Sequence, residues 1–407
     1  AWQGKNGALA QLSLRMDGPA HTEALEAFAR LFVPAWPELT AVDGGKWTLR
    51  AEVTPAKLRD MIQGARRGKQ VGVEGVSMEM LNMMYDTDEG ARMVDGMLCD
   101  VCECAETAQW PEELYTIVYV LLLKKYGNPG LISDRREIAL QAHIVKLYFT
   151  AIRQTSFRRL EGRLHEAHKG WTPECSTWDA GLPALLVLQQ QRRLRRCVYM
   201  LWVDIKKFFP MSDRGALDVA ARLKGLPDQV RSFVDNFYSH LTARLDGQAG
   251  LGEEYSVLMG AIMGCKLSTD RCKLLIDIVV AAIAATAAGV PLWGAGSDVI
   301  VRYLLAVFAD DMKLLFDDEA QLLRAWALLN TWSVLSRAVI AVERFSKTVV
   351  AGVGFLPSGR AVTIEVPELT CWITKQQVPV LPLHMAYKHV GGPRRPDGRC
   401  DDDLALC

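Results

Sequence analysis

The chain of 407 residues is 50% hydrophobic, which is too apolar for a disordered protein and long enough for roughly two or three subdomains with cores of their own. Lys and Arg together number 47, and so do Asp and Glu, so the formal net charge is zero. That balance excludes a uniformly basic protein, but it still allows a basic groove that acidic surface offsets elsewhere.

The ends and the apolar runs of the sequence favour an intracellular protein. The first residues have neither an initiator Met nor a basic, apolar secretion signal, so we expect a piece of a longer chain located in the nucleus or cytoplasm. The uncharged stretch 278–297 is long enough to span a membrane, yet it contains Gly289 and Pro291 and lacks flanking basic clusters. We therefore expect a buried helix followed by a turn, and no membrane partner. The scattered cysteines suit a reducing compartment.

Taken in chain order, the first half of the sequence alternates helical patterns with one clear strand. Thr54 and Pro55 are typical of a helix start, as N-cap and first-turn residue of a helix over 53–66. Helical patterns are also expected at 21–39, up to about residue 108, at 138–164 and at about 179–196, and the β-branched, aromatic run 114–125 predicts a strand. Cys99, Cys102 and Cys104 have the spacing of half a zinc site, but no second half follows, so we interpret them as helix residues.

Three aspartates follow strand-like runs in the second half. The segment VFADDMKLLF (307–316) predicts a β-hairpin that turns at Asp310 and Asp311, between strands 301–308 and 312–316. A neighbouring strand, LWVD, ends at Asp204. Carboxylates at adjacent strand ends could hold two divalent metal ions, which would offset their mutual repulsion and stabilise both oxygens of a phosphoryl displacement. Taken alone, however, an Asp-Asp pair is also typical of a surface turn.

The order of the surrounding segments carries a family resemblance, from about Val53 to Gly392. VFADDMKLLF resembles the YADD segment of the reverse transcriptases of non-LTR (LINE-type) retrotransposons. In the same order as in that family, segments of this chain are similar to seven further motifs: GVEGVSMEML to GPDGIPAELL, LLLKKYGNPGLISDRREIAL to LIPKPGK…YRPISL, KGWTPECST to GFRPGRST, VDIKKFFPMSDRGAL to DIKKAFDSV, GAIMGCKLSTDRCKLLID to QGCPLSP, SKT to KT, and YKHVGG to YKYLG.

The resemblance implies an α+β fold of the right-hand polymerase type, with fingers, palm and a partial thumb, in which a small antiparallel palm sheet packs on helices. It implies an N-terminal helical extension or linker at 1–45, fingers at 46–197, a palm at 198–350, and the primer-grip region with the start of a thumb at 351–407. The implied activity is RNA-directed DNA polymerisation, with an RNA template, a DNA primer and deoxynucleoside triphosphates as partners and Mg²⁺, or Mn²⁺, as cofactor. Protein partners stay unknown.

The resemblance also implies roles for individual residues. Asp204 and Asp310 would be metal ligands, Asp311 would support them, and the backbone carbonyl of Ile205 would be a further ligand. The residues implied to contact the nucleotide are Lys124 or its neighbour Lys125, Arg136, Phe209 as the gate beneath the sugar, Gly264 and Ser268 under the templating pair, and Lys347 as proton donor to the leaving pyrophosphate.

Several positions depart from the family pattern and keep a second hypothesis open. Met263 stands for the family's Gln, Thr269 and Glu137 for two prolines, and Pro210 for the Asp after the gate residue. The alternative is a catalytically weak or inactive, domesticated reverse-transcriptase fold that serves as a nucleic-acid-binding or structural scaffold. An origin among group II intron-type enzymes is a further, weaker family alternative. The segment HEAHK is one residue short of a zinc-protease motif, and we assign it no site.

Overall fold

The computed structural model describes residues 19–41, 43–65, 68, 72, 75–107, 109–124, 127–131, 134–247, 250–294, 298–342, 348–385, 387–389 and 392–396. The chain divides into two compact units, each assembled from separate stretches of sequence. The first comprises Ala1–Pro34, Leu164–Phe208 and Lys273–Cys407, and the second Ala35–Arg163 and Phe209–Cys272. The boundaries expected after residues 45, 197 and 350 stay predictions, since this division cuts the chain at other places.

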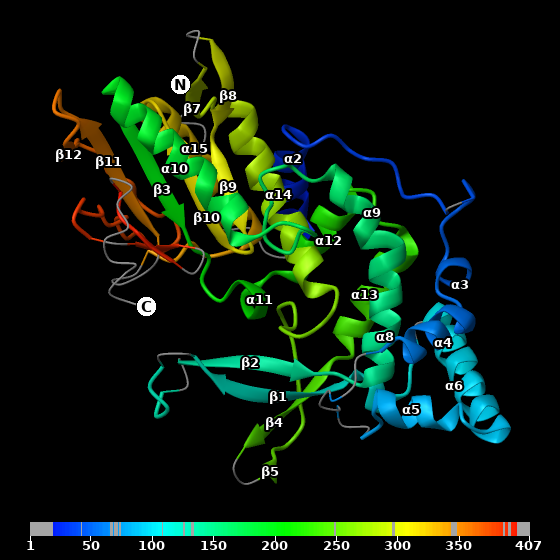
Figure 1. Ribbon diagram of the computed structural model, residues 1–407. Helices are drawn as coiled ribbons and strands as arrows, with labels where there is room; N and C mark the ends of the chain where they lie inside the picture. Colours follow the sequence, from blue (N-terminus) through cyan, green and yellow to red (C-terminus); the bar gives the residue numbers. More distant parts are fainter. Residues whose placement is uncertain are drawn as a thin grey trace. The chain divides into compact units, whose positions relative to one another are not determined.

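The first unit is built on an antiparallel sheet that carries the aspartate hairpin at one end (Figure 1). Its strand order is β12 (Ala361–Thr363), β11 (Val349–Phe355), β3 (Val198–Val203), β10 (Asp311–Phe316), β9 (Leu305–Phe308). Every neighbouring pair in this sheet is antiparallel. Two further pairs, β7 (Val290–Trp293) with β8 (Val299–Tyr303) and β13 (Tyr387–His389) with β14 (Gly392–Arg394), form small sheets of their own.

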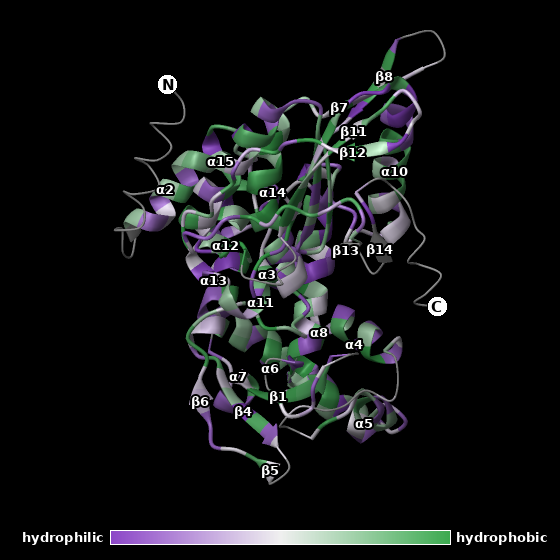
Figure 2. Cartoon of the chain, turned by 90° about the vertical axis from the view of Figure 1, so that its left-hand side faces the viewer, coloured by the Kyte–Doolittle hydropathy of each residue, from purple (hydrophilic) through white to green (hydrophobic). Residues whose placement is uncertain are grey.

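Helices cover both faces of this sheet, because β3 and β10 are apolar on both faces. The helices of the unit are α2 (Pro19–Arg30), α10 (Thr177–Leu194), α14 (Ser268–Thr286) and α15 (Glu319–Ser336). The part of α14 from Lys273 onward belongs to this unit. On one face, Val198, Met200 and Trp202 pack with Ala184 and Val187 of α10. On the other side of the strands lies α15, which contacts β3 and β10 (Figure 2). Burial on both faces makes the register of these strands specific.

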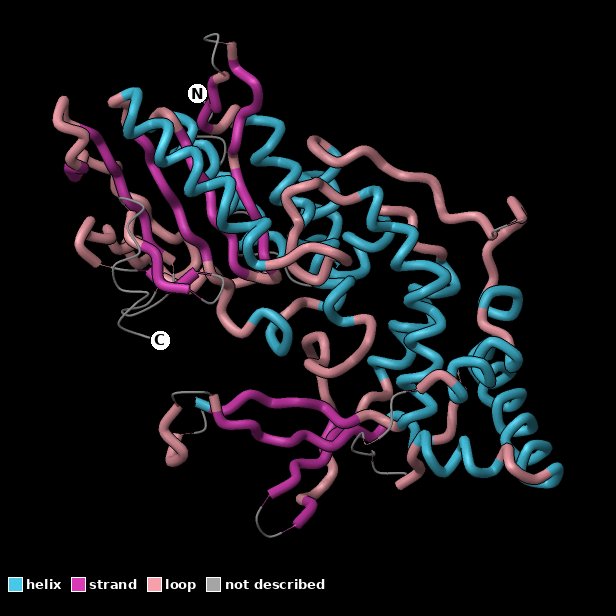
Figure 3. The backbone as a smooth tube through the Cα atoms, viewed as in Figure 1, coloured by secondary structure: helices cyan, strands magenta, loops and turns pink. Residues whose placement is uncertain are grey.

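The second unit combines helices with a mixed sheet (Figure 3). The sheet runs β2 (Arg135–Leu140), β1 (Thr116–Leu123), β4 (Thr242–Gly247), β5 (Gly250–Leu251), and β6 (Tyr255–Ser256) also pairs with β4. The helices are α3 (Leu49–Glu52), α4 (Pro55–Gln63), α5 (Met78–Met84), α6 (Asp88–Thr107), α7 (Glu112–Tyr115), α8 (His143–Ile152), a π-helical turn (Arg153–Phe157), α9 (Arg158–Leu160), a 3₁₀ turn (Glu161–Arg163), α11 (Phe208–Met211, all but its first residue), α12 (Arg214–Leu223) and α13 (Asp228–Ser239).

An aromatic cluster forms the core of the second unit. The Trp110 ring lies edge-on to Tyr148 at 5.3 Å between centroids and to Phe233 at 5.1 Å, and Phe149 meets Phe237 at 4.8 Å. Edge-to-face contacts of this kind add to the stabilisation that burial already provides. The cluster joins α8 to α13, so it fixes the helical base from which β1, β2 and β4 extend.

Most of the expected elements are confirmed, with some differences. The helix expected at 21–39 ends at Arg30, the last residue of α2, and the chain from 31 to 39 is not helical. Thr54 caps α4 as predicted, accepting a hydrogen bond from the amide of Lys57 at 3.3 Å. The stretch 138–164 was wrong as a continuous helix, because Ile138–Leu140 pair with Val118–Val120 in the sheet. The stretch 278–297 holds the buried end of α14, and a strand, β7, follows the expected turn. Within the described residues, no helix combines the length and apolarity that crossing a bilayer requires.

The three clustered cysteines lie on α6, as expected, and differ in burial. Cys102 is buried and burial raises the pKa of its thiol to about 11, whereas Cys99 is exposed. At pH 8 only about one in 10³ of the Cys102 thiols would be ionised, and thiolate is the reactive form. We expect iodoacetamide at pH 8 to label Cys99 and spare Cys102 in peptide mass spectra of the folded protein. Equal labelling of the two would contradict this burial.

Candidate active site

The strand register brings two of the predicted carboxylates to facing positions. Met312 of β10 lies opposite Val203 of β3 in their antiparallel ladder. The ladder ends at this pair, and its register extended by one step would set Asp311 opposite Asp204, the residue that follows β3. Residues facing each other in an antiparallel pair have Cβ atoms roughly 4.5–5.5 Å apart. Both carboxylates are half-buried.

The third carboxylate lies in a tight turn. Phe308 pairs with Asp311, so Ala309 and Asp310 alone make the turn between β9 and β10. Ala309 has φ of +62°, in the left-handed region that costs an L-residue about 1–2 kcal/mol. Lys207, three residues after Asp204, also has a positive φ of +45°. Unusual backbone at both carboxylate segments is typical of functional sites, where surrounding contacts hold it in place.

The hairpin prediction is confirmed at the turn, but the expected strand 301–308 is divided. Its first half belongs to β8 and pairs with β7, and its second half, β9, pairs with β10. The change of partner occurs at Leu304, whose Cα would lie 2.6 Å from a Cβ on Gly289. Only glycine allows that close backbone approach, and the strand changes partner where it occurs.

The backbone of Asp204 is held from the opposite side of β3. Its amide donates to the buried Thr348 hydroxyl at 3.0 Å, and that hydroxyl donates back to the Asp204 carbonyl at 3.3 Å. The Ala341 amide donates to the same carbonyl at 2.9 Å, and the Lys206 amide donates to Val339 at 2.8 Å. These bonds fix the main chain that carries the carboxylate.

The same bonds determine where the Ile205 carbonyl points. Ile205 is buried and forms an antiparallel bridge with Ile340, and the bonds of the bridge are made by its neighbours, Asp204 and Lys206. Because successive residues of a strand direct their amides and carbonyls to alternate sides, the Ile205 carbonyl points away from residues 339–341. The predicted role of this carbonyl as a metal ligand stays a prediction, and its orientation is compatible with it.

Replacing Thr348 by Val should loosen this arrangement. Valine keeps the shape of the side chain but loses both hydrogen bonds to Asp204, which would leave a buried amide unpaired. We expect the free energy of unfolding to fall by about 1–3 kcal/mol in urea denaturation. Thr348→Ser keeps the hydroxyl and is the matched control. No loss in Thr348→Val, with a loss in Thr348→Ser, would show that the methyl group, and not the hydrogen bonds, matters at this position.

The chemistry of these donors fits a hard divalent cation. Asp204, Asp310 and Asp311 offer carboxylate oxygens, the ligands that Mg²⁺ and Mn²⁺ prefer. In the described part of the chain, no three Asp, Glu, His or Cys side chains are already grouped around one point as metal ligands. Asp204 and Asp311 lie at the same end of β3 and β10, and Asp310, in the turn, directly precedes Asp311 in the chain.

The predicted phosphate-binding residues of the second unit share one face of a hairpin. Arg136 lies opposite Leu122 in the β1–β2 ladder, and Lys124 follows two positions after Leu122 on the same face. Both are exposed. Glu137, opposite Leu121, lies on the other face, so its charge points away from that pair of cations. Lys125, the alternative to Lys124, lies outside the described residues.

Gly264 and Ser268 lie where the chain approaches β2 and enters α14. Gly264 has φ of +115°, and a Cβ there would come within 2.5 Å of the Ala139 carbonyl oxygen, so no other residue fits without a shift. The adjacent Met263 carbonyl accepts from the Ala139 amide at 2.8 Å. Ser268 is buried, and its hydroxyl contacts that of Tyr238 at 3.0 Å. Its predicted contact with a nucleotide stays untested.

Phe209 is half-buried on α11, and its carbonyl accepts from the Ala261 amide at 2.8 Å. It belongs to the second unit, whereas the three aspartates belong to the first. Its predicted place beneath a sugar therefore stays a prediction. Lys347 lies outside the described residues.

Two buried charged features of the first unit were not predicted from the sequence. Lys313 is buried in β10, with its ammonium 5.5 Å from the centre of the Trp202 ring in β3, where the two residues face each other. A lysine inside an apolar strand run was the available signal. His168 and Asp277 form the second feature, a buried contact of 3.1 Å, for which two charged residues in apolar surroundings gave only a weak signal.

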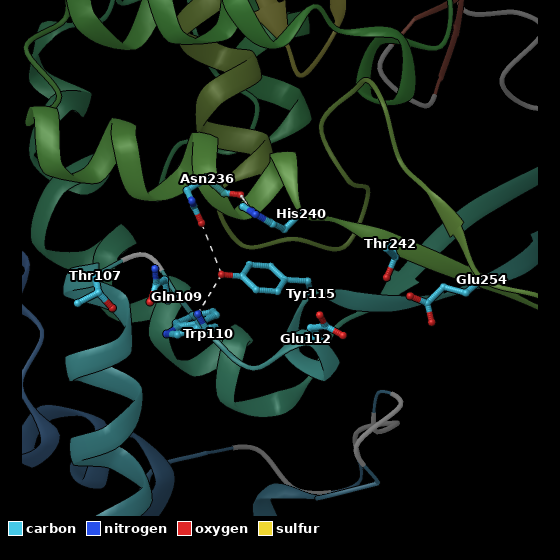
Figure 4. A pocket seen from close by; sticks show the side chains of 9 residues that line it. All are labelled: Thr107, Gln109, Trp110, Glu112, Tyr115, Asn236, His240, Thr242 and Glu254. Atoms are coloured by element: carbon cyan, nitrogen blue, oxygen red, sulfur yellow. Dashed lines mark hydrogen bonds between the residues drawn. The ribbon is translucent and has the colours of Figure 1, made fainter.

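Two pockets lined by described residues of the second unit contain none of the predicted site residues. One pocket of about 570 Å³ is lined by Thr107, Gln109, Trp110, Glu112, Tyr115, Asn236, His240, Thr242 and Glu254 (Figure 4). It holds two carboxylates, no lysine and no arginine, so its charge disfavours a phosphate ligand.

Comparison with known proteins gives a weak similarity to solved structures. No protein-family model matches the sequence, and no curated protein matches it either. Among solved structures, the chain is similar to apo telomerase from Candida tropicalis truncated from its C-terminal domain, at 15% identity and a TM-score of 0.41. The similarity covers 66% of this chain and 55% of the telomerase chain. A TM-score below 0.5 does not establish a shared fold.

Proposed function

We propose that the chain is an RNA-directed DNA polymerase related to the reverse transcriptases of non-LTR retrotransposons. In this proposal the first unit contains most of the palm expected at 198–350, and the second unit contains most of the fingers expected at 46–197. The observation that carries the proposal is the strand register that brings Asp204 and Asp311 to the same end of the neighbouring strands β3 and β10, beside the Asp310 turn. The ordered series of eight motif-like segments supports it independently.

The proposed reaction needs charge stabilisation and alignment more than covalent chemistry by the protein. The primer 3′-hydroxyl attacks the α-phosphorus of a deoxynucleoside triphosphate, a new phosphodiester bond forms, and pyrophosphate leaves. Asp204 and Asp310, with Asp311 and the Ile205 carbonyl, would hold Mg²⁺ or Mn²⁺, which when bound stabilises the charge on the attacking and leaving oxygens.

The residues of the second unit would bind and orient the nucleotide. Arg136 and Lys124 would neutralise the triphosphate, since an arginine makes paired hydrogen bonds to phosphate and lysine adds a point charge. Phe209 would exclude a ribose 2′-hydroxyl, Gly264 and Ser268 would lie under the templating pair, and Lys347 would protonate the pyrophosphate.

Primer extension tests the proposed function. Oligo(dT)-primed poly(rA), dTTP and Mg²⁺, then Mn²⁺, should give products longer than the primer, and EDTA should prevent them. Absence of extension by the folded protein under both metals would contradict the polymerase and favour the domesticated scaffold. In that case, binding of the primer–template in a mobility shift, without extension, would support a nucleic-acid-binding role.

Phe209→Val tests the gate. Removing the ring should make room for a 2′-hydroxyl, so we expect discrimination against ribonucleotides, measured as the ratio of kcat/KM for dTTP over UTP, to fall about 10- to 100-fold. Met211→Val, on the same short helix, is the matched control and should keep the ratio of the unchanged protein. If the dTTP-over-UTP ratio in Phe209→Val equals that of the unchanged protein, Phe209 does not exclude the 2′-hydroxyl and this role is wrong.

A further inference from the structure

A short segment of the first unit, residues 165–170, runs along the outer edge of β9. The Val307 amide donates to the Ala167 carbonyl at 2.9 Å, and the Lys169 amide donates to the Val307 carbonyl at 2.8 Å. The Gly170 amide reaches the same carbonyl at 3.3 Å. These bonds make a parallel bridge between His168 and Val307, three residues before Asp310. Residues 165–170 therefore cover the outer edge of β9, the edge strand of the hairpin that carries Asp310 and Asp311.

Gly170, the last residue of this segment, lies very close to the backbone of the Ala309–Asp310 turn. A Cβ placed on Gly170 would lie 2.1 Å from the Ala309 amide nitrogen and 2.8 Å from the Phe308 carbonyl carbon. Both are backbone atoms that cannot rotate aside. Ala309 is the turn residue with a positive φ, a conformation that persists only where neighbouring contacts enforce it. Gly170 makes such a contact.

Buried polar contacts with α14 anchor the other side of the segment. His168 Nε2 lies 3.1 Å from Asp277 Oδ1, and both side chains are almost fully buried. The same carboxylate accepts from the His165 amide at 2.8 Å. One turn earlier on α14, Lys273 donates to the Thr172 hydroxyl at 2.6 Å. Burying a carboxylate is costly unless hydrogen bonds compensate, so these contacts specify one placement of the segment.

We propose that residues 165–170 form a positioning strap, in which the His168–Asp277 contact and the side-chain-free Gly170 hold the Ala309–Asp310 turn in its working geometry. This inference rests on the proposed function for its catalytic consequence. His168, Asp277 and Gly170 are positioning residues and would touch neither metal nor nucleotide. A misplacement of about 1 Å at a reacting group can lower a rate about 10²-fold, so loosening the strap should lower kcat.

Gly170→Ala and Gly181→Ala are a matched pair for testing the strap. Both glycines belong to the first unit, but a Cβ on Gly181, in α10, meets nothing within 4 Å. We expect Gly170→Ala to lower kcat for primer extension about 10- to 100-fold with an unchanged KM for dTTP. Gly181→Ala should keep both constants. Equal kcat values in the two variants would overturn the strap.

Hydrogen exchange makes the test independent of catalysis. Peptides that span the Phe308–Asp311 turn should exchange faster in Gly170→Ala than in Gly181→Ala. Peptides from α15 should exchange at the same rate in both variants. If the unmodified protein does not extend primers, the proposed function fails while the exchange result still decides the strap. Identical exchange at the turn would overturn it.

A second pair of variants covers the case in which Gly170→Ala does not fold. His168→Leu leaves the Asp277 carboxylate without its imidazole contact, whereas His168→Gln can place an amide donor near the position of Nε2. Faster exchange at the turn in His168→Leu, restored in part by His168→Gln, is the expected result. Equal exchange in the two would contradict an anchoring role for the histidine.

Discussion

Replacing Asp310 by Asn is expected to abolish primer extension, lowering its rate at least about 10³-fold, with no loss of fold. The amide keeps the size of the carboxylate and the geometry of the two-residue turn, but it removes the negative charge that would hold a divalent cation. The variant should therefore unfold at the same urea concentration as the unmodified protein.

Asp298→Asn provides the matched control, because Asp298 is an exposed aspartate of the same unit, beside β8. It undergoes the same chemical change away from the carboxylate turn and should keep full activity. Steady-state extension rates in Mg²⁺ separate the two variants. Residual activity in Asp310→Asn within a few-fold of the control would remove Asp310 from the metal-binding set.

The largest expected effect on stability comes from Trp332 in α15. Its side chain is fully buried, and its indole nitrogen donates to the Leu275 carbonyl of α14 at 3.1 Å. Trp332→Ala should therefore leave a cavity between two helices of the first unit and remove the indole hydrogen bond to the Leu275 carbonyl. We expect a loss of about 3–5 kcal/mol in the free energy of unfolding.

Trp332→Phe separates the two contributions to this loss. Phenylalanine fills most of the space but cannot donate a hydrogen bond, so its loss should be clearly smaller than that of alanine. Circular dichroism during urea unfolding measures both variants. A loss below 1 kcal/mol for alanine would mean that α14 and α15 close over the gap, which dense packing opposes.

What the sequence could predict of the fold follows from local chemistry. Thr54 and Pro55 specify a helix start by their own side chains, and the capped helix forms there. The apolar and β-branched runs that form β1, β3 and β10 likewise predicted strands. The Asp310–Asp311 turn was predictable because two polar residues interrupt an apolar run, which a hairpin turn accommodates.

The parts that the sequence could not predict depend on long-range contacts. The division of 301–308 into β8 and β9 occurs where the chain passes close to Gly289, which lies more than ten residues away. The approach of Asp204 and Asp311 depends on the register of two strands separated by about a hundred residues. The segment 165–170 has no periodic pattern of apolar residues, so its backbone hydrogen bonds to β9 could not be predicted from the sequence.

The central claim is that Asp204, Asp310 and Asp311 together hold divalent cations. Crystals grown with primer–template, an unreactive deoxynucleotide analogue and Mn²⁺ would test it most directly, through the anomalous scattering of manganese. We expect anomalous peaks bounded by these three carboxylates at the ends of β3 and β9–β10, and their loss in Asp310→Asn. Bound duplex and nucleotide with manganese elsewhere, or with none at these carboxylates, would contradict the claim.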